Sequence, residues 1–149
     1  MPNKKFNVGV IGYGWSAQAH IAAINATGLA QVTAICSSRQ LNPAELSARH
    51  GGTINCYSDL AALLADSTIH VADICSYPQD HARQAIAAAK AGKHLILEKP
   101  IALRWEDCLE VQQAVTAAKV RACVCFECRF SSQLRTIKAI VNRGLLGRI

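Results

Sequence analysis

Aromatic side chains and runs of basic residues are both scarce in this sequence. Phe, Trp and Tyr make up 5% of the 149 residues, although the net charge is +6 at pH 7. Proteins that hold single-stranded nucleic acid stack its bases on aromatic rings, and basic arms that bind nucleic acid are blocks of like charge. Because the sequence has neither feature, we expect no nucleic-acid partner. A small polyanionic ligand accounts for the positive charge equally well.

Long apolar runs are also missing. The longest uncharged apolar runs end after a handful of residues at Gly, Lys or Asp, whereas a helix needs about 20 apolar residues to cross a bilayer. This excludes a membrane-spanning segment. Near the start of the chain, Gly9, Gly12 and Gly14 break the apolar stretch, so the sequence shows no signal-peptide core. We therefore expect a cytoplasmic protein without a membrane partner.

The seven cysteines are an odd number, which does not suit a framework of disulfide bridges. Since they lie scattered in apolar segments, we expect most of them to be buried thiols in a reducing compartment. Cys123, Cys125 and Cys128 suggest a zinc site. However, Cys123 and Cys125 fall on one face of a predicted strand, and no paired Cys-x-x-Cys or His-x-x-x-His lies nearby in sequence. We expect no metal site.

Short apolar strands alternate along the chain with longer helical segments, without repeats or low-complexity linkers. This alternation is typical of a parallel sheet with helices on both faces. The expected fold class is therefore α/β, a Rossmann-type doubly wound parallel sheet with three αβα layers. Strands are predicted over residues 7–11, 32–36, 54–57, 71–75, 94–97 and 122–126. Helices are predicted over residues 16–27, 42–51, 59–65, 80–91, 105–119 and 132–143.

A glycine-rich turn joins the first predicted strand to the first predicted helix. Gly12 would permit a tight turn there, and Gly14 would let backbone N–H groups approach a pyrophosphate. Ala17 stands where the fingerprint has its third glycine. The alternative is the glycine-rich turn of any α/β protein. The strand before and the helix after favour a dinucleotide site, whose residues we predict to be Gly12, Tyr13, Gly14 and Trp15.

The residues after the second predicted strand are expected to determine whether the protein prefers NAD or NADP. About 20 residues after the glycine loop, an Asp or Glu would accept a hydrogen bond from the ribose 2'-hydroxyl of NAD. The first acidic residue of the chain is Glu45, and Ser37, Ser38 and Arg39 end the strand instead. Two hydroxyls and a guanidinium suit a 2'-phosphate, which favours NADP, with NAD possible. In the alternative, Arg39 is a solvated loop charge and the serines cap the turn.

Polar residues also follow the later strands. Ser76, Pro78 and His81 come after the fourth strand, and Glu98 and Lys99 after the fifth. Open parallel sheets bind ligands at the carboxyl ends of their strands, so these residues are candidates for the wall of the site. A lysine at such a place can orient and polarise a reacting oxygen. On composition alone, a local ion pair is the better interpretation of Glu98 and Lys99.

Two motifs of this chain are spaced as in one known family. They are Gly12-x-Gly14-x-x-Ala17-x-x-His20, and Gly92-Lys93-His94 leading through three apolar residues to Glu98-Lys99-Pro100. Together they resemble the glucose-fructose oxidoreductase, inositol dehydrogenase and MocA (Gfo/Idh/MocA) family of NAD(P)-dependent oxidoreductases. Further segments are similar to the family, so that the resemblance covers essentially the whole chain: Pro78 with His81, Arg129-Phe130-Ser131 and Gly144-x-x-Gly147-Arg148-Ile149.

The resemblance implies roles for several residues. In the family, the lysine that matches Lys99 is a catalytic residue near the nicotinamide and the substrate, and the bond that matches Lys99-Pro100 is commonly cis. The loops that match Ser76 to His81 and Glu98 to Lys99 line the cofactor site. The implied function is an NADP(H)-dependent oxidoreductase, which transfers hydride to or from a sugar, a polyol or a related carbonyl or alcohol.

Family members continue into a second domain, α+β and mostly β, which builds the substrate pocket and usually supplies an Asp and a His for proton transfer. This domain is absent from the chain, so we expect residues 1–130 to form the dinucleotide-binding domain and residues 131–149 a helix and the start of a connection. The isolated chain should bind cofactor without turnover. We expect the full-length protein to act on a small molecule and to form a homo-oligomer through the second domain.

Other interpretations stay open on the sequence alone. One is a redox sensor or binding module that keeps the dinucleotide site without catalysis. Another is a glycoside-cleaving member of the same family with tightly held NAD, although the missing acidic residue after the second strand speaks against that cofactor. His20 is expected to be structural or to lie at the rim of the site. The helix over 132–143 and the tail with Leu145, Leu146 and Ile149 should expose apolar surface, which predicts self-association.

Overall fold

Six parallel strands form a single sheet in the computed structural model, which describes residues 5–148. The strands are β1 (Phe6–Ile11), β2 (Ala30–Cys36), β3 (Asn55–Tyr57), β4 (Val71–Ile74), β5 (His94–Glu98) and β6 (Ala122–Cys125). Their order in the sheet is β3-β2-β1-β4-β5-β6, and every neighbouring pair is parallel. The order reverses between β1 and β4, which confirms the predicted doubly wound sheet.

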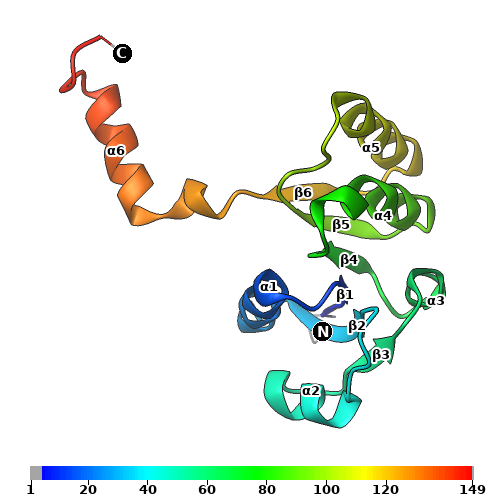
Figure 1. Ribbon diagram of the computed structural model, residues 1–149. Helices are drawn as coiled ribbons and strands as arrows, with labels where there is room; N and C mark the ends of the chain where they lie inside the picture. The colour runs from blue at the N-terminus through cyan, green and yellow to red at the C-terminus, as the bar shows by residue number, and fades with distance from the viewer. Residues whose placement is uncertain (1–4, 149) are drawn as a thin grey trace.

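Helices cover both faces of the sheet (Figure 1). One face carries α1 (Trp15–Ala26) and α2 (Pro43–His50), and the other carries α3 (Leu60–Ala65), α4 (Pro78–Lys90) and α5 (Trp105–Ala118). Each face has its own apolar core, with Ile21 of α1 in one and Leu63 of α3 in the other. Two separate cores are what a three-layer αβα arrangement requires, because the sheet stands between them.

Side chains and prolines set the starts of several helices. The Asn42 side chain accepts hydrogen bonds from the amides of Ala44 and Glu45 and so caps α2, where the sequence predicts the start of a helix. Asp59 caps α3 and Ser131 caps α6 (Ser132–Asn142) in the same way. The fourth helix begins at Pro78, two residues before the predicted start, since proline fits the first turn of a helix, where its missing N–H is no loss.

One strand departs from regular pairing. Val8 of β1 pairs with Val32 of β2, but the next residue, Gly9, pairs with Ala34. Thr33 is therefore an extra residue in β2, the signature of a β-bulge. Its Oγ1 is buried and has no hydrogen-bond partner within residues 5–148. The bulge explains how Val32 and Ile35, an odd number of positions apart, enter the same core.

The cysteines are less buried than the sequence suggested. All seven are free thiols, but only Cys36 and Cys75 are buried, and Cys123 and Cys128 are exposed. The expectation of mostly buried thiols is therefore wrong. The reason is topological: β6 is the last strand of the sheet, so that Cys123 has a neighbouring strand on one side only.

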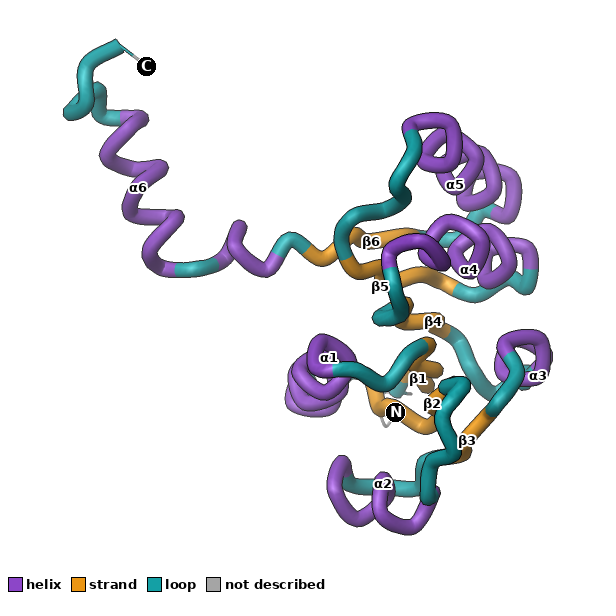
Figure 2. Tube along the Cα trace, viewed as in Figure 1, coloured by secondary structure: helices purple, strands orange, loops and turns teal. Residues whose placement is uncertain are grey.

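The last helix stands apart from the three layers (Figure 2). After β6 the chain forms a short 3-10 helix, η1 (Glu127–Phe130), and α6 contacts η1 rather than the sheet. Leu134, Ile137 and Val141 of α6 are exposed, as are Leu145 and Leu146. This confirms the expected apolar surface, except at Ile149, which lies outside the described residues. No helix within residues 5–148 has the length and apolar character needed to span a bilayer.

Candidate functional site

Gly12 lies where the carboxyl ends of three strands meet. Its N–H donates to the Cys36 carbonyl oxygen at the end of β2, 2.8 Å away. A Cβ added to Gly12 would lie 2.8 Å from the Cys75 carbonyl oxygen after β4. The Gly12 φ of +91° is also in the region that favours glycine. Only glycine allows β1 to turn into α1 this close to the neighbouring strand.

The N-terminus of α1 has the features of a phosphate cradle. Gly14 is its N-cap, no side chain caps it, and its first turn contains no acidic residue. Every other α-helix within residues 5–148 has a side-chain cap, an acidic residue in its first turn, or both. A Cβ added to Gly14 would meet no atom within 4 Å, so the space above the loop is open. Uncapped N–H groups facing open space fit a pyrophosphate.

The two aromatic residues of the loop point in different directions. The Tyr13 hydroxyl shares a 2.8 Å hydrogen bond with Nε2 of His50 at the end of α2, and the two rings meet edge to face. Burial and the nearby Arg49 charge lower the pKa of His50. Trp15, by contrast, is 86% exposed. Tyr13 thus joins the loop to α2, while Trp15 is free to cover a bound molecule.

The three residues predicted to select NADP lie beside this loop. The Arg39 guanidinium donates to the Tyr13 carbonyl oxygen. Ser37 is buried, and its Oγ accepts from the Arg39 amide at 3.1 Å, which makes it a turn-capping hydroxyl. Ser38 and Arg39 are exposed. The fold therefore brings Arg39 to the glycine loop, whereas the Ser37 hydroxyl is already hydrogen-bonded to the Arg39 amide within the turn.

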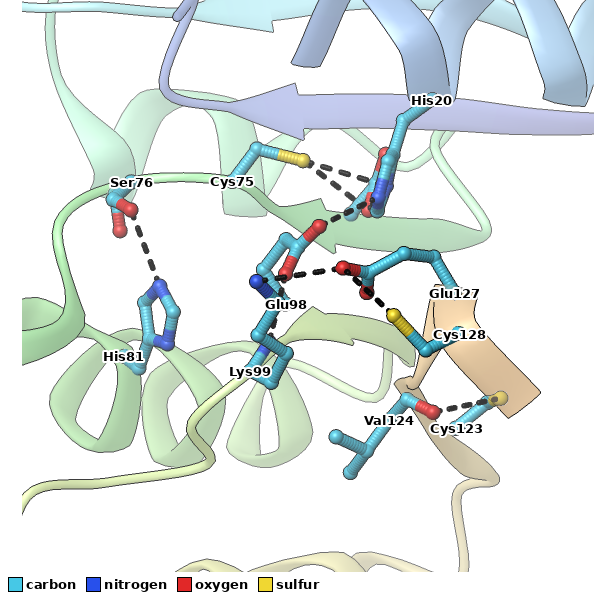
Figure 3. A network of polar contacts seen from close by, with 11 residues as sticks. His20, Cys75, Ser76, His81, Glu98, Lys99, Cys123, Val124, Glu127 and Cys128 are labelled. Carbon is cyan, nitrogen blue, oxygen red and sulfur yellow. Dashed lines mark hydrogen bonds and ion pairs between the residues drawn. The ribbon is translucent and has the colours of Figure 1, made fainter. Parts of the chain in front are cut away.

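The loop after β4 is supported from behind by His81. The His81 side chain is buried, and its Nδ1 lies 2.7 Å from the Pro100 carbonyl oxygen. Its Nε2 lies 3.1 Å from the Ser76 carbonyl oxygen (Figure 3). The Ser76 hydroxyl donates to Oε1 of Gln84, 2.5 Å away. His81 therefore connects the loop after β4 to the loop after β5 through their backbones. Pro78 starts α4 on the same side.

Lys99 leaves β5 with a fixed backbone and an exposed side chain. Its amide donates to Oε2 of Glu98 at 2.8 Å, and the Lys99-Pro100 bond is cis, as the family resemblance implied. Its Nζ lies 3.5 Å from Oε1 of Glu127 in η1 (Figure 3). The ion pair expected between Glu98 and Lys99 is therefore made with Glu127, because the Glu98 carboxylate turns back to the Lys99 backbone and to α1. Both charged groups of the pair are more than half exposed, so it is weak.

A buried polar network that the sequence reading missed lies beneath Lys99. Nδ1 of His20 on α1 is 2.9 Å from Oδ1 of Asp73, and Nε2 is 3.2 Å from Oε1 of Glu98. Asp73 is fully buried in β4, and the Cys75 Sγ lies 3.4 Å from Nδ1 of His20. The hydrogen bond to Asp73 raises the pKa of His20, with a smaller contribution from Glu98, against the effect of burial.

The atoms of His20, Asp73 and Cys75 are near enough to one another to bind a metal ion. Their chemistry fits a hydrogen-bonded network better. Both ring nitrogens of His20 already face carboxylates. Burial and the neighbouring Asp73 raise the pKa of the Cys75 thiol far above its ordinary value, so Cys75 is a neutral thiol within this network.

Comparison with known proteins places this site in a family. The sequence model described as "Oxidoreductase family, NAD-binding Rossmann fold" (Gfo/Idh/MocA) matches residues 6–126. The chain belongs to the Gfo/Idh/MocA family. Levoglucosan dehydrogenase of Pseudarthrobacter phenanthrenivorans is 33% identical to it in an alignment 153 residues long, which covers 98% of this chain and 39% of that protein.

Solved Gfo/Idh/MocA-like structures have the same fold. The WlbA dehydrogenase from Bordetella pertussis, in complex with NADH and UDP-GlcNAcA, aligns with a TM-score of 0.84 at 31% identity. The alignment covers 98% of this chain and 45% of the WlbA chain. Scyllo-inositol dehydrogenase from Lactobacillus casei with bound NAD(H) and scyllo-inositol aligns with a TM-score of 0.81 at 28% identity. This alignment covers 98% of our chain and 43% of that enzyme. The chain thus spans less than half the length of these proteins.

The Gfo/Idh/MocA match covers the glycine loop, Arg39, the His20 network and Lys99, but it ends one residue before Glu127. Glu127 is the ion-pair partner of Lys99. One part of the candidate site therefore comes from η1, which lies outside the matched segment.

Proposed function

We propose that this chain is the cofactor-binding half of an oxidoreductase that uses NADP(H) to transfer hydride to or from a sugar, a polyol or a related carbonyl or alcohol. The observation that carries the proposal is the uncapped N-terminus of α1, which follows Gly12 at the point where the strand order reverses. The names of similar proteins support the substrate class, since they include a levoglucosan dehydrogenase and a scyllo-inositol dehydrogenase.

In this proposal the pyrophosphate of the cofactor rests on residues 12–15. The backbone N–H groups at the start of α1 donate to its oxygens, and Gly14 keeps the approach free of a side chain. Trp15, which is 86% exposed, shelters the bound cofactor from water. The +6 net charge of the chain favours the approach of this anion.

The proposed choice of NADP rests on Arg39. Its guanidinium is held at the Tyr13 carbonyl oxygen, beside the phosphate loop, and the exposed Ser38 hydroxyl adjoins it. A guanidinium can hold a phosphate through two parallel hydrogen bonds, which an uncharged ribose hydroxyl does not offer. The two similar structures contain NADH or NAD(H), so the proposed preference for NADP is a property of this chain's own residues.

Lys99 is the proposed catalytic residue. The bound nicotinamide supplies the hydride chemistry. The exposed Lys99 ammonium orients the reacting oxygen of the substrate and stabilises negative charge there, while Glu127 holds it in the absence of substrate. Glu98 fixes the Lys99 backbone, and the loop of Ser76 and Pro78, which His81 supports from behind, forms the adjoining wall of the nicotinamide site.

The proposal extends to the full-length protein. A second, α+β domain would complete the substrate pocket, supply proton-transfer groups and join subunits into a homo-oligomer, so the isolated chain should bind cofactor without turnover. Residues 131–149 would form the connection, which the separation of α6 from the sheet supports. A cytoplasmic setting is part of the proposal and is favoured by the seven free thiols.

Fluorescence titration of this chain with NADPH and NADH tests the proposal. The wild-type chain should bind NADPH more tightly, and Arg39→Ala should weaken NADPH binding about tenfold or more, as expected when a hydrogen bond to a charged group is lost, with little effect on NADH. Arg121→Ala removes an exposed arginine at the opposite edge of the sheet and should change neither affinity. An NADPH preference that survives Arg39→Ala would remove Arg39 from its role, and equal, weak binding of both cofactors would favour a redox sensor or an α/β fold with an ordinary glycine-rich turn.

A further inference from the structure

The ring of His20 lies between two carboxylates from different strands. Asp73 approaches Nδ1 from β4, with its two oxygens at 2.9 and 3.1 Å, and Glu98 approaches Nε2 from the end of β5 at 3.2 Å. Both nitrogens can donate to these oxygens only when the ring carries two protons. The arrangement fits an imidazolium between the Asp73 and Glu98 carboxyl groups, and Figure 3 shows the contact of His20 with Glu98.

We infer that His20 is a positioning residue, which as a cation between Asp73 and Glu98 fixes the Lys99 backbone to the helix that forms the phosphate site. The role of Lys99 in this inference rests on the proposed function. The inference itself concerns contacts within the chain, and these can be measured without a cofactor.

Glu98 carries the connection from His20 to Lys99. One of its oxygens faces His20, and the other accepts from the Lys99 amide at 2.8 Å. A carboxylate held at both oxygens has little freedom to turn, and its side chain is 15% exposed. On the far side of Lys99, the Pro100 carbonyl oxygen is held by His81 at 2.7 Å. The Lys99 backbone is thus fixed on both sides, while its Nζ stays exposed.

The charges around His20 favour its protonated form. The groups that face the ring are Asp73 and Cys75 at β4 and Glu98 at β5. Cys125 of β6 pairs with Glu98 in register, and burial raises its pKa to about 11. The neighbours of His20 are therefore the carboxyl groups of Asp73 and Glu98 and two thiols, whose raised pKa values keep them neutral near pH 7. Hydrogen bonds to the carboxylates raise the pKa of His20, in agreement with the geometry.

The helix links this cation to the phosphate site. His20 belongs to α1, the helix that Gly14 caps and whose N-terminus receives the pyrophosphate in the proposed function. An α-helix is a rigid element, so a displacement of its first turn moves His20 and, through Glu98, Lys99. Loss of the His20 cation should therefore weaken cofactor binding as well as release the Lys99 backbone.

NMR titration of this chain in the absence of cofactor tests the inference. Ring ¹⁵N shifts should show His20 with two protons at pH 7, and the Lys99 amide shift should follow the His20 titration. In His20→Gln the Lys99 transition should disappear. His94→Gln is the matched control, because the His94 Nδ1 accepts from the Arg121 amide at the opposite end of β5, and it should keep the transition. A neutral His20 at pH 7, or a Lys99 transition that persists in His20→Gln, would overturn the inference.

Glu98→Gln provides a second variant, should His20→Gln fail to fold. It removes one carboxylate from His20, so the His20 pKa should fall while the Asp73 contact remains. An unchanged His20 titration would contradict the shared cation.

Cofactor titration separates this inference from the proposed function. His20→Gln should raise the NADPH dissociation constant about tenfold and remove its dependence on pH above the ordinary histidine pKa of 6.5. A merely structural role would lower stability but leave that dependence in place. If the wild-type chain binds neither NADPH nor NADH, the proposed function is wrong, and the NMR titration still decides the role of His20.

Discussion

Replacing Gly12 with alanine should destabilise this fold by about 2 to 5 kcal/mol. The Gly12 φ of +91° costs a residue with a Cβ about 1 to 2 kcal/mol. The new Cβ would also lie 2.8 Å from the Cys75 carbonyl oxygen and 2.9 Å from the Ser76 Cα. These are backbone atoms, which cannot rotate away as a side chain can, and overpacking of this kind costs about 1 to 3 kcal/mol. The perturbation falls between β1 and β4, where the sheet reverses its order.

Urea unfolding followed by circular dichroism measures the loss, with Gly14→Ala as the matched control. Gly14 has a φ of −99° and open space around its added Cβ, so alanine there should cost at most about 1 kcal/mol, the difference between the two residues at an N-cap. Gly14→Ala should instead weaken NADPH binding, because its methyl group enters the space assigned to the pyrophosphate. A loss below about 1 kcal/mol for Gly12→Ala, or an equal loss for both variants, would refute the reasoning.

Three further measurements test other features of the fold. The raised pKa of His20 stabilises the fold fully below the ordinary pKa of 6.5, and this stabilisation is lost as pH rises through the raised pKa. The unfolding free energies of wild type and His20→Gln should therefore differ more at pH 6 than at pH 9. A difference that does not change with pH would contradict this. Thr33→Val removes a buried hydroxyl without a hydrogen-bond partner in residues 5–148 and should stabilise the chain by about 1 kcal/mol. Thr68→Val is the control, since it removes a 2.7 Å hydrogen bond to Asp66 and should destabilise the chain. A loss of stability in Thr33→Val would argue against the bulge geometry. Light scattering should detect self-association through the exposed face of α6, reduced by Ile137→Glu, and a clean monomer at high concentration would exclude it.

The sheet could be predicted from the sequence because local signals mark each of its parts. Gly28, Gly51 and Gly92 follow helices and have positive φ, and Asn42 caps α2 through its side chain. Such residues act over a few positions of the chain, so they can be recognised without knowledge of the tertiary structure. The alternation of strands and helices indicates parallel strands with right-handed crossovers, whereas the order β3-β2-β1-β4-β5-β6 comes from the structure. The extra residue at Thr33 has no such local signal.

The His20 network could not be predicted in the same way, because its members come from α1, β4 and β5. The sequence held a partial signal. Asp73 interrupts an otherwise apolar central strand, and His20 is next to Ile21 on the inner face of α1. A buried carboxylate requires a donor, and a histidine on the facing helix is the obvious candidate. What the sequence lacks is the register between α1 and β4, which sets the 2.9 Å contact.

The same limit explains Lys99. Its neighbour Glu98 was the expected ion-pair partner, since adjacent charges in sequence are the easiest to connect. In a strand, however, successive side chains point to opposite faces. Glu98 therefore points to the α1 side, where His20 and the Lys99 amide satisfy it, and Nζ of Lys99 reaches Glu127 of η1 instead. Helix α1 thus acts at two places, with its N-terminus facing the open phosphate loop and His20 holding the strand exit that carries Lys99. In the proposed function, one helix therefore supports both the pyrophosphate site and the Lys99 backbone.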